Sequence, residues 1–147
     1  VMEEGYGHDK EVVEVGVRYR YNNGEMKRDF TYVDDIINGL LILLNSPPKG
    51  INHWNSQISD PSSSKAPFKL YNIGNNSPVN LIDFIIEIEN QLGMKAKIKY
   101  KPLQPGDVVA SHADVQDLVE DFGYKPKTTI TEGIRKFIEW YKELYHT

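Results

Sequence analysis

The sequence has no cysteine among its 147 residues. Disulfide bonds, thiolate metal sites and a cysteine nucleophile are therefore excluded, and a reducing compartment is compatible with the composition. Long apolar runs are also missing. The longest, Ile36 to Leu44, is interrupted by Asn38 and Gly39 and is far shorter than the ~18 residues of a membrane span. No signal-peptide pattern opens the chain, so we expect a cytoplasmic protein; because residue 1 is not methionine, we expect a processed or partial chain.

An excess of charge of one sign is absent as well. Seventeen basic and 21 acidic residues are interspersed and give a net charge of −4. Without a basic run, the chain has no electrostatic footprint for nucleic acid, and no nucleic-acid partner is expected. The four histidines are scattered without metal-ligand spacing, so no metal is expected. The glycine-rich dinucleotide fingerprint and the nucleophile elbow are also missing from the sequence.

The apolar and turn-forming residues that are present predict an α/β fold. Alternating Val and Tyr residues indicate a first strand, helical periodicity indicates later helices, and Gly or Pro marks their ends. In helix 33–44, one apolar face consists of Ile36, Leu40, Leu43 and Leu44. In helix 81–92, the expected buried side consists of Leu81, Phe84, Ile85, Ile88 and Leu92. The last helix is indicated by Thr131 with Ile134, Phe137, Ile138 and Tyr141. The predicted order is a strand at 11–21, a turn at 22–24, helix 33–44, an exposed loop at 50–67, strand 68–73, helix 81–92 capped by Asn80, strand 96–100, helix 114–122 and helix 131–144.

The segment Asn22–Asp35 combines a turn, an Arg-Asp pair, two aromatic residues and an acidic helix start. Arg28 is its candidate functional residue, because a guanidinium fork matches two phosphate oxygens at once. A structural alternative is that Arg28 pairs with Asp29, Asp34 or Asp35 and ties the loop to the helix. Near the N-terminus, Tyr6 and Lys10 have the spacing of a catalytic Tyr-x-x-x-Lys pair, but the residues between them are poor helix formers, and we interpret the match as coincidence.

Four motifs occur in a familiar order: Asn23-Gly-Glu-Met-Lys-Arg-Asp-Phe-Thr-Tyr-Val-Asp-Asp35, Tyr71-Asn-Ile-Gly-Asn-Asn-Ser-Pro-Val79, Gln104-Pro-Gly-Asp-Val108 and Gly123-Tyr-Lys-Pro126. Together they resemble the C-terminal half of extended short-chain dehydrogenase/reductase nucleotide-sugar epimerases. Within that family, the motifs most resemble those of the UDP-glucuronate 4-epimerases of capsule and O-antigen pathways. The resemblance covers roughly residues 15 to 145 and implies a small sheet with about four helices, which bind a nucleotide sugar while an N-terminal Rossmann half binds NAD.

The resemblance also implies roles for individual residues. Arg28 would grip the diphosphate, Tyr21 would contact uracil, Asp107 would accept hydrogen bonds from ribose hydroxyls, and Gln104 would stand where many relatives carry a second phosphate-binding arginine. Residues 1–14 do not match the expected lead-in helix and are interpreted as a loose segment, which leaves residues 15–147 as the nucleotide-sugar-binding domain.

Because the Rossmann half is missing from this sequence, NAD binding and catalysis are not expected from the chain alone. We expect a UDP-sugar-binding portion of an NAD-dependent 4-epimerase. Its apolar surface would pack against the missing half or drive self-association. The alternative is a structural remnant or oligomerisation module without a ligand.

Overall fold

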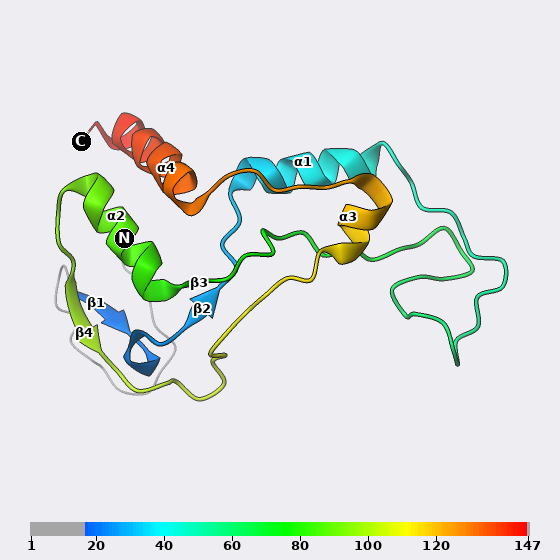
Figure 1. Ribbon diagram of the computed structural model, residues 1–147, viewed down its shortest axis with the longest axis horizontal. Helices are drawn as coiled ribbons and strands as arrows, with labels where there is room; N and C mark the ends of the chain where they lie inside the picture. Colours follow the sequence, from blue (N-terminus) through cyan, green and yellow to red (C-terminus); the bar gives the residue numbers. More distant parts are fainter. Residues whose placement is uncertain (1–16, 147) are drawn as a thin grey trace.

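The structure, a computed structural model, describes residues 17–146, within which short strands alternate with four helices (Figure 1). The predicted α/β class is confirmed. The expectations for residues 1–14, including Tyr6 and Lys10, lie outside the described residues. In chain order the elements are β1 (Val17–Arg20), the 3-10 turn η1 (Asn22–Gly24), β2 (Lys27–Arg28), α1 (Val33–Leu44), β3 (Val79–Asn80), α2 (Leu81–Leu92), β4 (Lys97–Tyr100), α3 (Gln116–Phe122) and α4 (Ile130–Tyr145).

The strands form two separate two-stranded sheets. β1 and β4 pair in parallel, with Val17 opposite Lys97 and Arg20 opposite Tyr100. The segment between them includes α2, which lies beside α4 at the same end of the molecule (Figure 1). Parallel neighbours need such a crossover because a tight hairpin can join only antiparallel strands.

The second sheet is short but well anchored. β2 pairs antiparallel with β3 on one edge. On the other edge, the Lys27 amide donates to the Val109 carbonyl at 2.9 Å, and the Ser111 amide donates to the Lys27 carbonyl at 3.1 Å. β2 is therefore held between two segments that are distant in the sequence, and the backbone at Arg28 is fixed from both sides.

Glycine and asparagine end the regular elements as predicted. Asn22, Asn23 and Gly24 have φ values of 48°, 53° and 84°, which confirms the predicted turn. Gly93 and Gly123 follow α2 and α3 with φ values of 67° and 64°, the left-handed conformation of a helix C-cap. The predicted helices are confirmed, although α3 begins at Gln116 and not at Asp114.

Asn80 occupies the predicted N-cap position of α2, but the capping hydrogen bond expected from its side chain is not formed. Asn80 precedes α2 with extended backbone. Its amide nitrogen instead donates to Asp83 Oδ2 at 2.7 Å, since the acidic residue in the first turn competes for the amide. Thr129 at the start of α4 does act as a cap, because its hydroxyl oxygen accepts from the Glu132 amide at 3.3 Å.

The predicted strand at 68–73 is also wrong. In the described part of the chain, this segment has one isolated bridge, between Lys69 and Ser63, and no strand beside it. Side chains hold it instead: the Tyr71 hydroxyl donates to Asp121 Oδ2 at 2.6 Å, and Lys69 Nζ pairs with the same oxygen at 2.5 Å. A strand-like sequence forms a strand only when another backbone is available for pairing.

The buried face of α1 differs from the prediction. Asp35 and Gly39 are buried, whereas Leu40 is 44% and Leu44 77% exposed. A Cβ at Gly39 would lie 3.2 Å from the Tyr124 ring, so the missing side chain lets that ring pack on the helix. Helical spacing locates an apolar stripe but does not say what covers it. The outward-facing stripe consists of Val33, Ile37, Leu40, Leu41 and Leu44.

The buried apolar side chains are few. One buried group lies in and around α3 and consists of Val115, Leu118 and Tyr124. A second group lies on α4 and consists of Ile134 and Ile138. On the same helix, the side chains of Phe137 and Tyr141 are 56% and 45% exposed. A chain that leaves this much apolar surface uncovered has surfaces available for other protein segments.

Candidate functional site

Arg28 lies at the end of β2 and points toward the loop that follows β4. Its Nη2 is 3.2 Å from Asp107 Oδ1, and its Nη1 donates to the Lys27 carbonyl at 2.8 Å and the Val109 carbonyl at 3.4 Å. The side chains of Arg28 and Asp107 are 26% and 33% exposed. The structure thus brings together two residues that the sequence analysis selected separately, in a position accessible to a ligand.

Asp107 and Gln104 belong to one turn. The Asp107 amide donates to the Gln104 carbonyl at 3.1 Å, and Gly106 has a φ of 85°. Asp107 Oδ1 also accepts from the Val108 amide at 2.8 Å, which orients the carboxylate. Gln104 is exposed. The turn therefore presents an acidic and an amide side chain beside a guanidinium.

Tyr21 lies at the base of this loop without a described side-chain contact to Arg28. Its neighbours in sequence connect to Lys101: the Lys101 amide donates to the Arg20 carbonyl at 2.7 Å, and the Asn23 amide donates to the Lys101 carbonyl at 3.2 Å. Tyr21 itself is half-buried between them. Arg28 therefore contacts Asp107, and Gln104 belongs to the same turn as Asp107.

The structural alternative for Arg28 is wrong in its choice of partner. Asp29 points away from Arg28, as alternation along a strand requires, and accepts from the backbone amides of Asn76 at 3.0 Å, Ser77 at 3.1 Å and Ala113 at 3.3 Å. Asp34 is exposed. Asp29 thus joins two loops, a role that the Arg-Asp sequence alone did not reveal.

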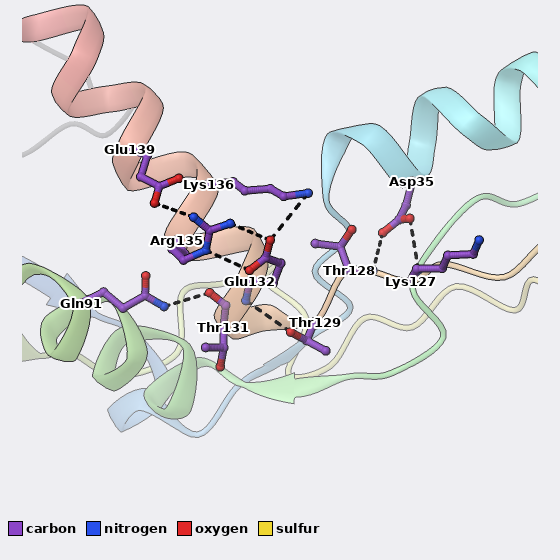
Figure 2. A network of polar contacts seen from close by, with 10 residues as sticks. All are labelled: Asp35, Gln91, Lys127, Thr128, Thr129, Thr131, Glu132, Arg135, Lys136 and Glu139. Carbon is purple, nitrogen blue, oxygen red and sulfur yellow. Dashed lines mark hydrogen bonds and ion pairs between the residues drawn. The ribbon is translucent and has the colours of Figure 1, made fainter.

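Asp35 has a structural role of the same kind at the start of α1. It is 5% exposed, and its oxygens accept from the amides of Lys127 at 3.1 Å and Thr128 at 3.0 Å (Figure 2). Burial raises the pKa of Asp35, but the hydrogen bonds from Thr128 and Lys127 outweigh it and hold the pKa below its ordinary value. The buried Tyr124 hydroxyl donates to the carbonyls of Asp35 at 3.4 Å and Gly74 at 3.3 Å.

Two hollows of the surface lie away from Arg28. A groove of about 1010 Å³ between α2, α4 and the start of α1 is lined mainly by apolar side chains and contains none of the four predicted residues. A smaller hollow of about 380 Å³ lies beside Lys27 and Val109 and also excludes them. An apolar groove is poorly suited to a charged, polar ligand such as a diphosphate.

Among residues 17–146, no group of three or more His, Asp or Glu side chains could hold a metal ion. Within the same residues, no helix is long and apolar enough to cross a membrane.

The fold and the ordered motifs resemble those of extended short-chain dehydrogenase/reductase enzymes. A sequence profile described as GDP-mannose 4,6 dehydratase matches residues 13–137. The chain belongs to that family.

Named relatives point to the same group. Protein CapI of Staphylococcus aureus is 51% identical over 125 residues, which is 85% of this chain and 37% of that protein. A probable UDP-glucuronate 4-epimerase of Rhizobium meliloti is 37% identical over 127 residues, 85% of this chain and 37% of that protein. The chain thus spans somewhat over a third of the length of these curated relatives.

Solved structures share the fold. UDP-glucuronic acid 4-epimerase from Bacillus cereus, in complex with UDP-glucuronic acid and NAD, matches with a TM-score of 0.66 and 23% identity, over 86% of this chain and 35% of that one. UDP-glucose 4-epimerase from Thermotoga maritima, with UDP-glucose, matches with a TM-score of 0.66 and 24% identity, over the same shares. These matches confirm the expected fold class.

Proposed function

We propose that this chain is the UDP-sugar-binding portion of an NAD-dependent nucleotide-sugar 4-epimerase, with a UDP-uronic acid as the class of substrate. The observation that carries the proposal is the pairing of Arg28 with Asp107 at an accessible edge of the molecule. Named relatives that are UDP-glucuronate 4-epimerases support the choice of sugar. Residues 15–147 form the binding domain in this proposal, with 50–67 as an exposed loop.

The guanidinium of Arg28 is the group that holds the diphosphate. Two of its contacts are to carbonyl oxygens, which fix the fork, and the third is to Asp107. A diphosphate replaces Asp107 as the acceptor for Nη2, because a bidentate charge-assisted contact is stronger than one exposed ion pair. Asp107, once released, accepts hydrogen bonds from the ribose hydroxyls. Gln104 donates its amide to a phosphate oxygen, and Tyr21 contacts the base.

The residues of this chain do not fit NAD. The strand end of β1 leads into Tyr21-Asn-Asn-Gly24 and that of β4 into Lys101-Pro-Leu103, and neither is the glycine-rich turn that opens onto a helix in a dinucleotide site. Hydride transfer is therefore assigned to no residue of this chain. A separate nucleotide-binding part supplies it in this proposal, and the outward apolar stripe of α1 is the surface against which that part packs.

Amide chemical shifts followed during titration with UDP-glucuronate test the proposal. Binding at the proposed site moves the resonances of Tyr21, Arg28 and the turn from Gln104 to Asp107, and leaves those of the distant Ser62–Ser64 segment unchanged. A titration that moves no resonance supports the alternative of a structural module without a ligand. Shifts confined to the groove between α2 and α4 would place the ligand at a different site.

A further inference from the structure

One face of the parallel β1–β4 sheet is lined by lysine side chains. Side chains alternate between the two faces of a strand, so Lys97 and Lys99 of β4 lie on the same face, and both are exposed. Lys101, directly after β4, belongs to this face as well, because its Nζ lies 4.2 Å from the centroid of the Tyr19 ring and Tyr19 is paired with Lys99. We call this surface, formed by Lys97, Lys99, Lys101 and Tyr19, the lysine face.

The opposite face of the sheet lies against α2. Arg20 of β1 is 5% exposed. A Cβ at Gly24 would lie 3.2 Å from Ile82 of α2 and 3.6 Å from Cδ of Arg20, so the helix and the arginine meet there. Glu89 of α2 also accepts from the Ala96 amide, just before β4, at 2.9 Å. Purely parallel sheets occur almost only with both faces covered, so the lysine face is the side of this sheet that still needs a cover.

The charge of the lysine face determines which cover fits it. Between Glu89 and Asp107 the chain contains four lysines and no acidic residue. Lys95 is bound by Glu89 at 2.8 Å, and the other three lysines belong to the lysine face. Along extended backbone, alternate side chains are spaced by roughly 6.6 Å. Like charges at this spacing repel one another, so an acidic segment that runs along the strand stabilises the sheet.

Residues 1–16, which lie outside the described part of the chain, have the opposite charge. They contain five acidic residues and one lysine, and therefore the whole net charge of −4, since residues 17–147 contain 16 basic and 16 acidic side chains. Asp9 and Glu11 are two positions apart, which is the interval between Lys97 and Lys99. An extended backbone would present both carboxylates on one side, at the spacing of the lysines.

The length and the attachment of this segment favour it over other occupants. From Lys97 to Lys101 the lysine face corresponds to roughly 17 Å of extended chain. Sixteen residues are enough for such a run and for the reversal that leads to it, and residue 16 directly precedes the first residue of β1. Because the segment is tethered beside the sheet, its effective concentration there is of the order of millimolar, which a free polyanion or a second copy does not reach at ordinary concentrations.

We propose that residues 1–16 dock on the lysine face, with Asp9 and Glu11 paired with Lys97 and Lys99. The docked segment supplies the second cover of the parallel sheet. It also neutralises a basic surface that would otherwise attract polyanions. The proposal is independent of the nucleotide-sugar site.

A spin label in the N-terminal segment tests this docking in the full 147-residue chain. Because the chain has no cysteine, His8→Cys provides a single attachment site for a nitroxide. Strong paramagnetic broadening is expected for the amide resonances of residues 97–101 and none for those of residues 62–64. Absence of broadening at residues 97–101 overturns the proposal. So does broadening in a mixture of spin-labelled chain with isotope-labelled chain, which would mean that a second copy occupies the lysine face.

Charge reversals then establish what holds the segment. In the spin-labelled chain, Lys97→Glu/Lys99→Glu and Asp9→Lys/Glu11→Lys are each expected to lose most of the broadening at residues 97–101. Combining the four changes is expected to restore it, which loss of folding could not do. Broadening that survives either pair of reversals overturns the proposal, because docking would then not depend on these charges.

Lys49→Glu/Lys65→Glu is the matched control, since it makes the same change of net charge at two exposed positions outside the sheet. It is expected to leave the broadening at residues 97–101 as it is in the spin-labelled parent. Loss of broadening in this control would mean that net charge alone governs the contact, and it would contradict the assignment of Lys97 and Lys99.

Discussion

Arg28 and Asp107 are 79 positions apart in the sequence, yet Nη2 of one lies 3.2 Å from Oδ1 of the other. Neither belongs to a helix, and the backbone that carries Arg28 is fixed by neighbours on both edges. The pair is partly exposed, so its contribution to stability is expected to be small. In the proposed function, the Asp107 carboxylate holds the guanidinium of Arg28 in place until a ligand arrives.

Replacing Arg28 by lysine tests whether binding depends on the positive charge alone or also on the planar guanidinium. Arg28→Lys retains the positive charge but loses the planar fork, so affinity for UDP is expected to fall roughly tenfold by fluorescence or calorimetric titration. Arg135→Lys, at an exposed position on α4, is the matched control and should leave the affinity unchanged. Equal affinity of Arg28→Lys and wild type would mean that only net charge matters at this position.

Replacing Asp107 distinguishes its two roles. Asp107→Ala frees Nη2 of Arg28, so inorganic pyrophosphate is expected to bind more tightly than to the wild type. The same change removes the proposed ribose acceptor, so uridine is expected to bind more weakly. Calorimetric titration with each probe separately measures the two changes in affinity, which are expected to have opposite signs. A decrease for both probes would show that Asp107 only supports the loop.

Asp35 makes stability depend on pH in the acidic range. Its pKa is lower in the folded chain than in the unfolded chain, where it is about 3.9. Its contribution is therefore complete above about pH 4 and is lost as the pH falls through the folded value, because the unfolded state then binds the proton more readily. Urea unfolding of Asp35→Asn should show a lower free energy of unfolding at neutral pH and a weaker decline with acid.

Asp34→Asn is the control for that experiment, because Asp34 is exposed in the same helical turn. It should retain both the wild-type stability and the wild-type acid dependence. An unchanged acid dependence in Asp35→Asn would mean that another carboxylate is responsible.

Gly74 lies where two loops approach each other closely. A Cβ there would lie 2.5 Å from Ala113 Cβ and 2.9 Å from Asp29 Oδ2. Gly74→Ala is therefore expected to lower the free energy of unfolding by about 1–3 kcal/mol, through overpacking and disturbance of the Asp29 hydrogen bonds. Ser77→Ala, which retains the backbone amide bound by Asp29, should change stability little in the same urea titration. A neutral Gly74→Ala would show that the two loops can separate without cost.

The helices could be predicted because their signals are local. Apolar spacing and the glycines at 93 and 123 located α2 and α3, and Thr131 with the apolar residues that follow it located α4. The segment 68–73 has the composition of a strand but no backbone neighbour among the described residues, and pairing depends on distant parts of a chain. The same reason explains why Leu40 and Phe137 are exposed: the pattern located an apolar face but not what covers it.

The candidate site was predictable only in part. A guanidinium in a loop indicates an anion contact, but no local pattern connects Arg28 to Asp107, and the family resemblance was needed to select both. Asp29 could have been assigned to the opposite side by strand alternation, had the short strand β2 been recognised. The three backbone amides that Asp29 binds could not have been predicted, since they belong to loops whose course is set by tertiary packing.

Calorimetric titration of UDP-glucuronate into the wild type, Arg28→Ala and the control Arg135→Ala tests the proposed function most directly. The wild type and the control are expected to bind with the same affinity, and Arg28→Ala to bind at least about tenfold more weakly, since it loses a charge-assisted contact worth about 1.5–3 kcal/mol. Equal binding by all three proteins, or no binding by the wild type, would contradict the assignment of Arg28 as the diphosphate contact.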